Sequence, residues 1–133
     1  TGHSAGGHLC ARLMCRDVEL ADDVAGRIKH CVPISCLSDL RPIARTKMND
    51  DLRLDAEEAE AESPVLCHDT RDIPVTVLVG AEERPVFLDQ SNWLVKAWPQ
   101  AKLRIAPGRH HFDVIEEMEQ PHSPLTEALV GGF

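Results

Sequence analysis

The 133-residue sequence has few aromatic residues and no tyrosine, so we expect no large aromatic binding surface. No apolar run approaches the roughly 20 residues of a membrane-spanning helix, and no stretch resembles a secretory signal. Basic residues are outnumbered by acidic ones, 14 against 22, which gives a net charge of −8. Because nucleic-acid affinity depends on Lys and Arg neutralising phosphates, this charge argues against a nucleic-acid partner. The composition predicts a single globular domain over residues 1–133 with no membrane association.

Paired cysteines are also missing. The five cysteines are odd in number and show no C-x-x-C spacing; they are Cys10, Cys15, Cys31, Cys36 and Cys67. This pattern favours neither a disulfide framework nor a zinc site. Cys10, Cys31 and Cys36 stand among apolar or small residues, so we expect them to be small buried hydrophobic side chains. A reducing, cytoplasmic location fits these thiols best.

Strands and helices alternate along the sequence. Strands are predicted at 28–34, 73–79 and 103–106, with the β-branched run 73–79 the strongest of them. Helices are predicted directly after Ser4 and at 50–63, 85–98, 113–118 and 123–129, and residues 17–27 are predicted to be a loop or a short helical turn. The Ala- and Glu-rich helix 50–63 is interpreted as a solvated face. Alternation of this kind indicates an α/β fold with a mostly parallel sheet and flanking helices.

The chain opens on a G-x-S-x-G pentapeptide formed by Gly2, Ser4 and Gly6. In one class of hydrolases this pattern is a sharp strand-to-helix turn that exposes the serine oxygen, with glycines where a Cβ would collide. A glycine-rich turn capped by Ser4 is the plainer interpretation of the same residues. The apolar residues that follow have helical spacing, which favours the first interpretation. The buried strand that should precede Ser4 is not found in the sequence.

An acid and a histidine follow the two later strands in the order Ser, acid, His. Glu82 and Glu83 come after strand 73–79, and His110 and His111 come after strand 103–106. The carboxyl ends of parallel strands share one edge of a sheet, so these side chains should approach Ser4.

These residues lie within stretches that resemble the kynurenine formamidase-like esterases, a branch of the α/β-hydrolases. The stretches are GHSAGGHL (2–9), VPISCLSDLRPI (32–43), MNDDLRLD (48–55), SPV (63–65), VLVGAEERPVFLDQS (77–91) and GRHHFDVI (108–115). The resemblance implies a partial α/β-hydrolase fold, the C-terminal half of that domain starting at the nucleophile elbow. The N-terminal strands of the family and its His-Gly-Gly segment have no counterpart in the sequence.

Carried onto this sequence, the resemblance implies that Ser4 is the nucleophile and His111 the general base, since the family's histidine directly precedes Phe. His110 is then a loop residue or a supporting partner. Glu83 would orient the imidazole, and the backbone N–H of Ala5 would be one oxyanion-hole donor.

Other residues near these positions keep open alternatives. Glu82, and more distantly Asp89, compete with Glu83 as the acid. His3 and His8 could line the pocket, although packing or capping roles explain them equally well.

Two further pairs are given structural interpretations. Asp39 and Arg41 are read as a loop ion pair. Of Trp93 and Trp98, one should pack in the core and the other should lie near the surface.

The expected function is cleavage of an ester or an N-formyl amide through an acyl-enzyme, either as an arylformamidase or as a general carboxylesterase. Such chemistry needs no metal and no organic cofactor. The expected partner is a small ester or formamide substrate. Members of the family often dimerise, so the resemblance also implies a homodimer. The alternative is a truncated, non-catalytic fragment of such a hydrolase, because the elbow's supporting strand and half of the oxyanion hole are not found.

Overall fold

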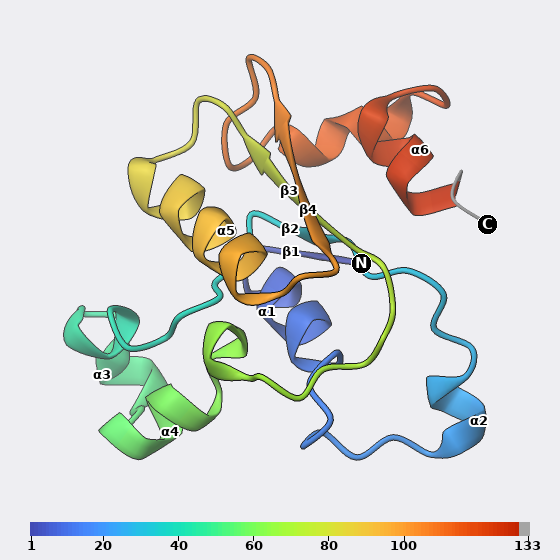
Figure 1. Cartoon of the computed structure of the whole chain (residues 1–133). Coiled ribbons are helices and arrows are strands. Elements are labelled where there is room, and N and C mark those ends of the chain that lie inside the picture. The colour runs from blue at the N-terminus through green and yellow to red at the C-terminus, as the bar shows by residue number, and fades with distance from the viewer. Residues whose placement is uncertain (131–133) are drawn as a thin grey trace.

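The fold is built on a four-stranded parallel sheet, seen in a computed structural model that describes residues 1–130 (Figure 1). The strands are β1 (Gly2–His3), β2 (Pro33–Ile34), β3 (Val75–Gly80) and β4 (Ala101–Ala106), and they lie in the order β1-β2-β3-β4. The helices are α1 (Ala5–Arg12), α2 (Asp22–Ala25), α3 (Asn49–Leu52), α4 (Ala56–Ala61), α5 (Pro85–Ala97) and α6 (Pro124–Val130), with 3₁₀ turns at Ile43–Arg45, Pro64–Leu66 and Val114–Glu119. The predicted α/β class with a parallel sheet is confirmed.

Strand β3 is the buried centre of this sheet. Four of its six residues are β-branched, which favours an extended backbone, and all six residues of the strand are buried. It pairs with β4 over six residues, from Val75 with Ala101 to Gly80 with Ala106. β4 is partly exposed because, within residues 1–130, it pairs on one side only. The helix α5 connects the two strands and returns the chain to the start of β4, as parallel pairing requires.

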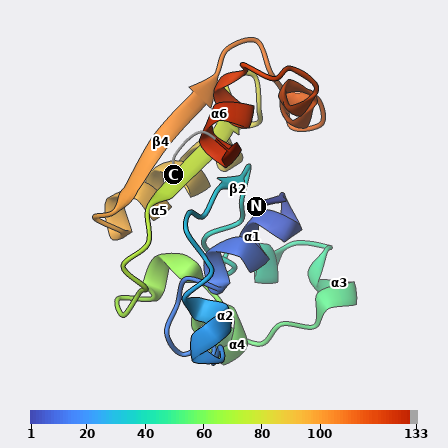
Figure 2. The same ribbon diagram turned by 90° about the vertical axis from the view of Figure 1, so that its right-hand side faces the viewer.

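Helices cover both faces of the sheet (Figures 1 and 2). On one face, Cys10 and Ala11 of α1 pack with Leu94 of α5 and with Trp98 beneath β3. On the other face lie α6 and the 3₁₀ turn before it, and a second core there combines Val32, Ile34, Leu78, Val114 and Leu125 with smaller neighbours. Val77 and Leu78 belong to different cores because successive side chains of a strand point to opposite faces.

Three predicted elements differ from the structure. The helix expected at 50–63 is two helices, α3 and α4, because Arg53 adopts a left-handed conformation (φ 55°) and Asp55 starts a new helix. Asp55 and Glu58 form a capping box there. The strand expected at 28–34 is reduced to Pro33–Ile34 plus a single bridge at Cys31. The helix expected at 113–118 is a 3₁₀ turn.

Other expectations about burial are confirmed. Trp98 is buried in the core, whereas Trp93 on α5 is 36% exposed. Cys10, Cys31 and Cys36 are buried, and all five cysteines are free thiols.

A two-residue strand, β1, does precede Ser4, although we expected none. No helix within residues 1–130 is both long enough and apolar enough to cross a membrane.

Candidate active site

Ser4 lies at a strained turn between β1 and α1. Its φ of 55° and ψ of −115° lie in a region that L-residues rarely adopt. The backbone N–H of Ser4 donates to the carbonyl of Ile34 at 2.9 Å, which fixes the turn to the end of β2. Ala5 follows as the first residue of α1, so its N–H is one of the helix-start donors that have no acceptor within the helix. This is the strand-turn-helix geometry of a nucleophile elbow.

The glycines of the elbow differ in how closely they are packed. A Cβ on Gly2 would lie 2.2 Å from the carbonyl oxygen of Gly6, so only glycine fits there. A Cβ on Gly6 would meet nothing within 4 Å, and our expectation that both glycines of the pentapeptide are sterically required is wrong for Gly6. The second close approach is instead at Gly7, whose Cβ would lie 2.8 Å from the carbonyl oxygen of Ile34.

His111 lies between Ser4 and Glu83. Its Nε2 is 3.1 Å from Ser4 Oγ, and its Nδ1 is 2.8 Å from Glu83 Oε2. The His111 side chain is 17% exposed and that of Glu83 is fully buried. The loop that carries His111 follows β4, and the acid follows β3. The structure therefore brings together, in hydrogen-bonding order, the three side chains that the resemblance singled out.

Glu83 is held by more than His111. Its Oε1 accepts from the backbone N–H of Gly80 at 2.9 Å and from the hydroxyl of Ser35. Glu82 and Asp89 are exposed, and within residues 1–130 neither forms a hydrogen bond to His111. A buried carboxylate needs such donors to offset its lost hydration, and Glu83 has them.

The two loops that carry Glu83 and His111 are fastened to each other. The N–H of Ala81 donates to the carbonyl oxygen of Ala106, and the N–H of Glu82 donates to the carbonyl oxygen of Arg109, both at 2.9 Å. Gly80 approaches the same loop so closely that a Cβ would lie 2.2 Å from the carbonyl oxygen of Arg109. Acid and base are thus fixed relative to one another by backbone contacts.

Three aromatic rings surround the imidazole of His111. Phe87 stacks on it with centroids 4.1 Å apart and planes at 27°. His3 lies at 4.6 Å and 43°, and Phe112 meets it edge-on at 5.3 Å. Burial, together with the neighbouring His111, lowers the pKa of His3. The Nε2 of His3 is buried and has no hydrogen-bond partner among residues 1–130.

A cavity of about 460 Å³ opens beside His111. It is lined by Glu82, Glu83, Arg84, Phe87, His110, His111 and Phe112. Two of its walls are aromatic and its rim is charged, and Phe112 is 79% exposed. A cavity of this size is large enough for a small organic molecule.

The other singled-out residues have structural partners. The ring of His110 pairs with Asp113 at 3.4 Å and accepts from the N–H of Phe112, as expected of a loop residue. The ring of His8 contacts the carbonyl of Glu62 at 2.7 Å, away from Ser4. Asp39 and Arg41 form the expected ion pair at 2.7 Å, which lowers the pKa of Asp39.

Two supporting residues were not found by sequence reasoning. Ser35 follows β2 at the same carboxyl edge as the acid, and its hydroxyl donates a hydrogen bond to Glu83. Gln90 of α5 is buried and its Oε1 accepts from the N–H groups of Ser38 and Asp39, both at 2.7 Å. A polar residue on the buried stripe of the helix was the available signal for Gln90.

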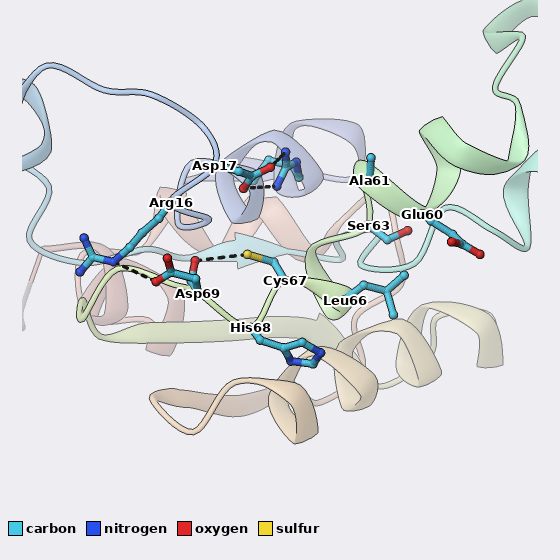
Figure 3. A pocket seen from close by; sticks show the side chains of 10 residues that line it. Arg16, Asp17, Glu60, Ala61, Ser63, Leu66, Cys67, His68 and Asp69 are labelled. Atoms are coloured by element: carbon cyan, nitrogen blue, oxygen red, sulfur yellow. Dashed lines mark hydrogen bonds and ion pairs between the residues drawn. The ribbon is translucent and has the colours of Figure 1, made fainter.

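One group of residues away from Ser4 has the composition of a metal site. Ligand atoms of Cys15, Asp17 and Cys67 lie within 4.8 Å of one another. Asp17 and Cys67 also line a cavity of about 490 Å³ (Figure 3). Asp17 is already engaged by the guanidinium of Arg12 at 2.7 and 3.1 Å. Burial raises the pKa of Cys15 to about 12, which disfavours its thiolate. In Figure 3 the ring of His68 points away from the Cys67 sulfur. Arg12 supplies the positive charge here, so the donor set does not favour a metal.

Comparisons with known proteins find relatives and solved structures that are similar to this chain. Kynurenine formamidase from Danio rerio is 32% identical over 138 residues, covering 97% of this chain and 47% of that protein. The crystal structure of a candidate thioesterase from Silicibacter sp. TM1040 is 53% identical, with a TM-score of 0.90, and covers 96% of this chain and 48% of that one. An esterase from Thermogutta terrifontis shares the fold, with a TM-score of 0.56 at 21% identity, covering 84% of this chain and 44% of that one. No family model matches the chain.

The parallel sheet, the strained serine turn and these neighbours define an α/β-hydrolase fold. Within that class, the chain is similar to kynurenine formamidases from Danio rerio and Salmo salar. It spans about half the length of the relatives it matches.

Proposed function

We propose that the protein is a serine hydrolase that cleaves a carboxylic ester or an N-formyl amide through an acyl-enzyme. One observation carries the proposal: the uninterrupted hydrogen-bonded series from Ser4 Oγ through His111 to the buried carboxylate of Glu83, at 3.1 and 2.8 Å. A serine oxygen is a weak nucleophile unless a base within hydrogen-bonding distance removes its proton. The names of the relatives, formamidase and esterase, support the same chemistry.

In the proposed reaction Ser4 Oγ attacks the acyl carbon while His111 Nε2 takes the hydroxyl proton. Glu83 holds Nδ1–H and stabilises the imidazolium that results. The N–H of Ala5 donates to the oxyanion of the tetrahedral intermediate. Collapse of the intermediate breaks the bond to the leaving alcohol or amine, which takes the proton from His111. Water then attacks the acyl-enzyme with His111 as base again, releasing the carboxylic acid and restoring Ser4.

The substrate class that we propose is a small acyl compound with an apolar or aromatic portion. The aromatic walls of the 460 Å³ cavity, Phe87 and Phe112, support this choice. For an N-formyl aryl amide the acid released is formate, and for an ester it is the corresponding short carboxylic acid. Steady-state hydrolysis of an N-formyl arylamine and of 4-nitrophenyl acetate, compared by kcat/KM, separates the arylformamidase from the general carboxylesterase.

A thioesterase is the second candidate function. The crystal structure that is 53% identical to this chain is described as a candidate thioesterase, and the proposed triad would attack a thioester carbonyl in the same way. A thiolate leaves more readily than an amine, so its departure depends less on proton donation from His111. An S-acyl substrate that exceeds the matched oxygen ester tenfold or more in kcat/KM would favour this function.

The proposal is tested by covalent labelling with a fluorophosphonate probe. We expect wild-type protein to be labelled on Ser4, as located by peptide mass spectrometry, and Ser4→Ala to be unlabelled. Ser91→Ala is the matched control, because the Ser91 hydroxyl is buried on α5 without a hydrogen-bond partner among residues 1–130. Labelling that persists in Ser4→Ala, or that is absent from the wild type, contradicts the proposal. A wild-type protein that is not labelled favours the non-catalytic alternative.

A further inference from the structure

Phe87 presents the face of its ring to the imidazole of His111. The ring centroids are 4.1 Å apart and the planes are inclined by 27°. The other aromatic neighbours meet His111 at steeper angles, 43° for His3 and 84° for Phe112. Phe87 is half-buried in the wall of the cavity, whereas Phe112 is 79% exposed. The stacked contact with Phe87 is therefore held in place by the packing of the site.

Glu83 lies in the turn between β3 and α5, and Phe87 lies four residues later in the first turn of α5. Glu83 reaches the edge of the imidazole at Nδ1, and Phe87 covers a face of the same ring. The helix α5 begins at Pro85, and the N–H of Phe87 donates to the carbonyl of Arg84 at 2.9 Å, which fixes Phe87 in its first turn. One segment thus restrains the imidazole from two directions.

A phenyl face attracts a cation more strongly than it attracts a neutral ring. The attraction operates within about 6 Å of the ring centroid, and the Phe87–His111 stack lies well inside that range. In the proposed reaction His111 is neutral at the start and becomes an imidazolium as Ser4 attacks. An interaction that is stronger with the imidazolium lowers the barrier, because it grows toward the transition state. An aliphatic side chain would fill the same space without this preference.

We propose that Phe87 is a positioning residue that stabilises the imidazolium form of His111 through its ring face. The inference rests on the proposed function, since it requires His111 to gain a proton during the reaction. Phe87 is uncharged, so replacing it leaves the charges around His111 in place. The charged and titratable groups around the ring are Glu83 from the β3–α5 turn and His3 from β1, with the rim groups Glu82, Arg84 and His110 further along the cavity wall.

The first test compares Phe87→Leu with Phe87→Tyr, using the rate constant for fluorophosphonate labelling measured from pH 5 to 9. We expect Phe87→Leu to reduce the plateau rate about 3- to 10-fold and to move the acidic limb of the profile to lower pH by about half a unit. Phe87→Tyr keeps the ring and restores both quantities. Trp93→Leu, the same class of substitution on the same helix, is the matched control and leaves the limb unmoved.

Each failure has its own signature. A wild-type protein that is not labelled counts against the proposed function. If the wild-type protein is labelled and Phe87→Leu reacts at the same rate, the role of Phe87 is overturned. If Phe87→Leu reacts more slowly but the acidic limb of its pH profile does not move, the role is overturned too, since simple misplacement of the His111 ring would lower the rate without moving the limb.

A second readout needs neither turnover nor a folded Leu variant. In wild-type protein and in Ser4→Ala, the ring current of Phe87 should shift the carbon-bound imidazole protons of His111 upfield in the NMR spectrum. A titration of these protons in Phe87→Tyr should follow that of the wild type. His111 protons without an upfield shift in the wild type overturn the stacked arrangement on which the inference depends.

Discussion

The Nδ1 atom of His111 lies 2.8 Å from Oε2 of Glu83, and the other oxygen of that carboxylate accepts from Ser35 and from the Gly80 N–H. Both oxygens of the buried acid therefore have partners. A carboxylate can accept hydrogen bonds but cannot donate them, so Nδ1 of the imidazole carries the hydrogen. Nε2 is then free to take a proton from Ser4 Oγ, which lies 3.1 Å away. Glu83 thereby sets which nitrogen of His111 faces the nucleophile.

The first prediction concerns the charge of this acid. We expect Glu83→Gln to lower kcat/KM by about 10²- to 10⁴-fold, because the amide can donate to Nδ1 and favour the wrong tautomer. Glu82→Gln changes a neighbouring exposed carboxylate by the same chemistry and should stay within about threefold of the wild type. The measurement is steady-state ester hydrolysis, with circular dichroism to verify folding. A larger loss in Glu82→Gln would move the acid to Glu82.

The second prediction concerns Ser35, which combines a buried hydroxyl with a φ of 48°. Ser35→Ala keeps the strained backbone and removes a donor from the Glu83 carboxylate, so it should destabilise the fold by about 1–3 kcal/mol. Ser35→Gly also removes the donor but relieves the positive φ, and it should be destabilised less than Ser35→Ala. Urea unfolding of the two variants gives the order. The reverse order would show that the backbone at Ser35 is not strained.

That Glu83 and His111 would lie near Ser4 could be predicted from the sequence. Side chains that follow parallel strands meet at one edge of the sheet, and both the acid and the histidine do so. The choice between Glu82 and Glu83 depends on which residue of a tight turn points inward, and the turn is set by the contact between Gly80 and the loop of His111. That contact joins parts of the chain far apart in sequence, so no local pattern reveals it.

Local patterns account for only part of the differences between the predicted and observed elements. The break between α3 and α4 has a readable signal, because Asp55 and Glu58 stand at capping-box spacing. The composition of residues 50–63 favours a helix so strongly that this signal is easily overlooked. Strand β2 is short because Pro33 carries no N–H and Ser35 turns to a positive φ directly after Ile34. That second cause is a consequence of tertiary packing.

The third prediction separates two glycines of the elbow. Gly2→Ala places a Cβ 2.2 Å from the carbonyl oxygen of Gly6, so the turn must move and fluorophosphonate labelling of Ser4 should be lost. Gly6→Ala meets nothing within 4 Å in the structure. Since Gly6 lies in α1, the alanine should raise the free energy of unfolding by about 0.5–1 kcal/mol. Thermal unfolding and labelling are measured on both variants. Lost labelling in Gly6→Ala with labelling retained in Gly2→Ala would contradict the assigned geometry.

The last prediction concerns the pH dependence of folding. Burial, and then the neighbouring His111, lowers the pKa of His3 below its ordinary value of 6.5. Below pH 6.5 the unfolded chain therefore takes up a proton on His3 that the folded chain does not, and stability falls as the pH decreases through that window. We expect His3→Gln to lose less stability than the wild type between pH 7.5 and 5.5, as measured by urea unfolding at each pH. His122→Gln, at an exposed position, is the matched control and should follow the wild type. A His3→Gln variant whose stability falls as steeply as that of the wild type would show that His3 is protonated equally in the folded and unfolded chains.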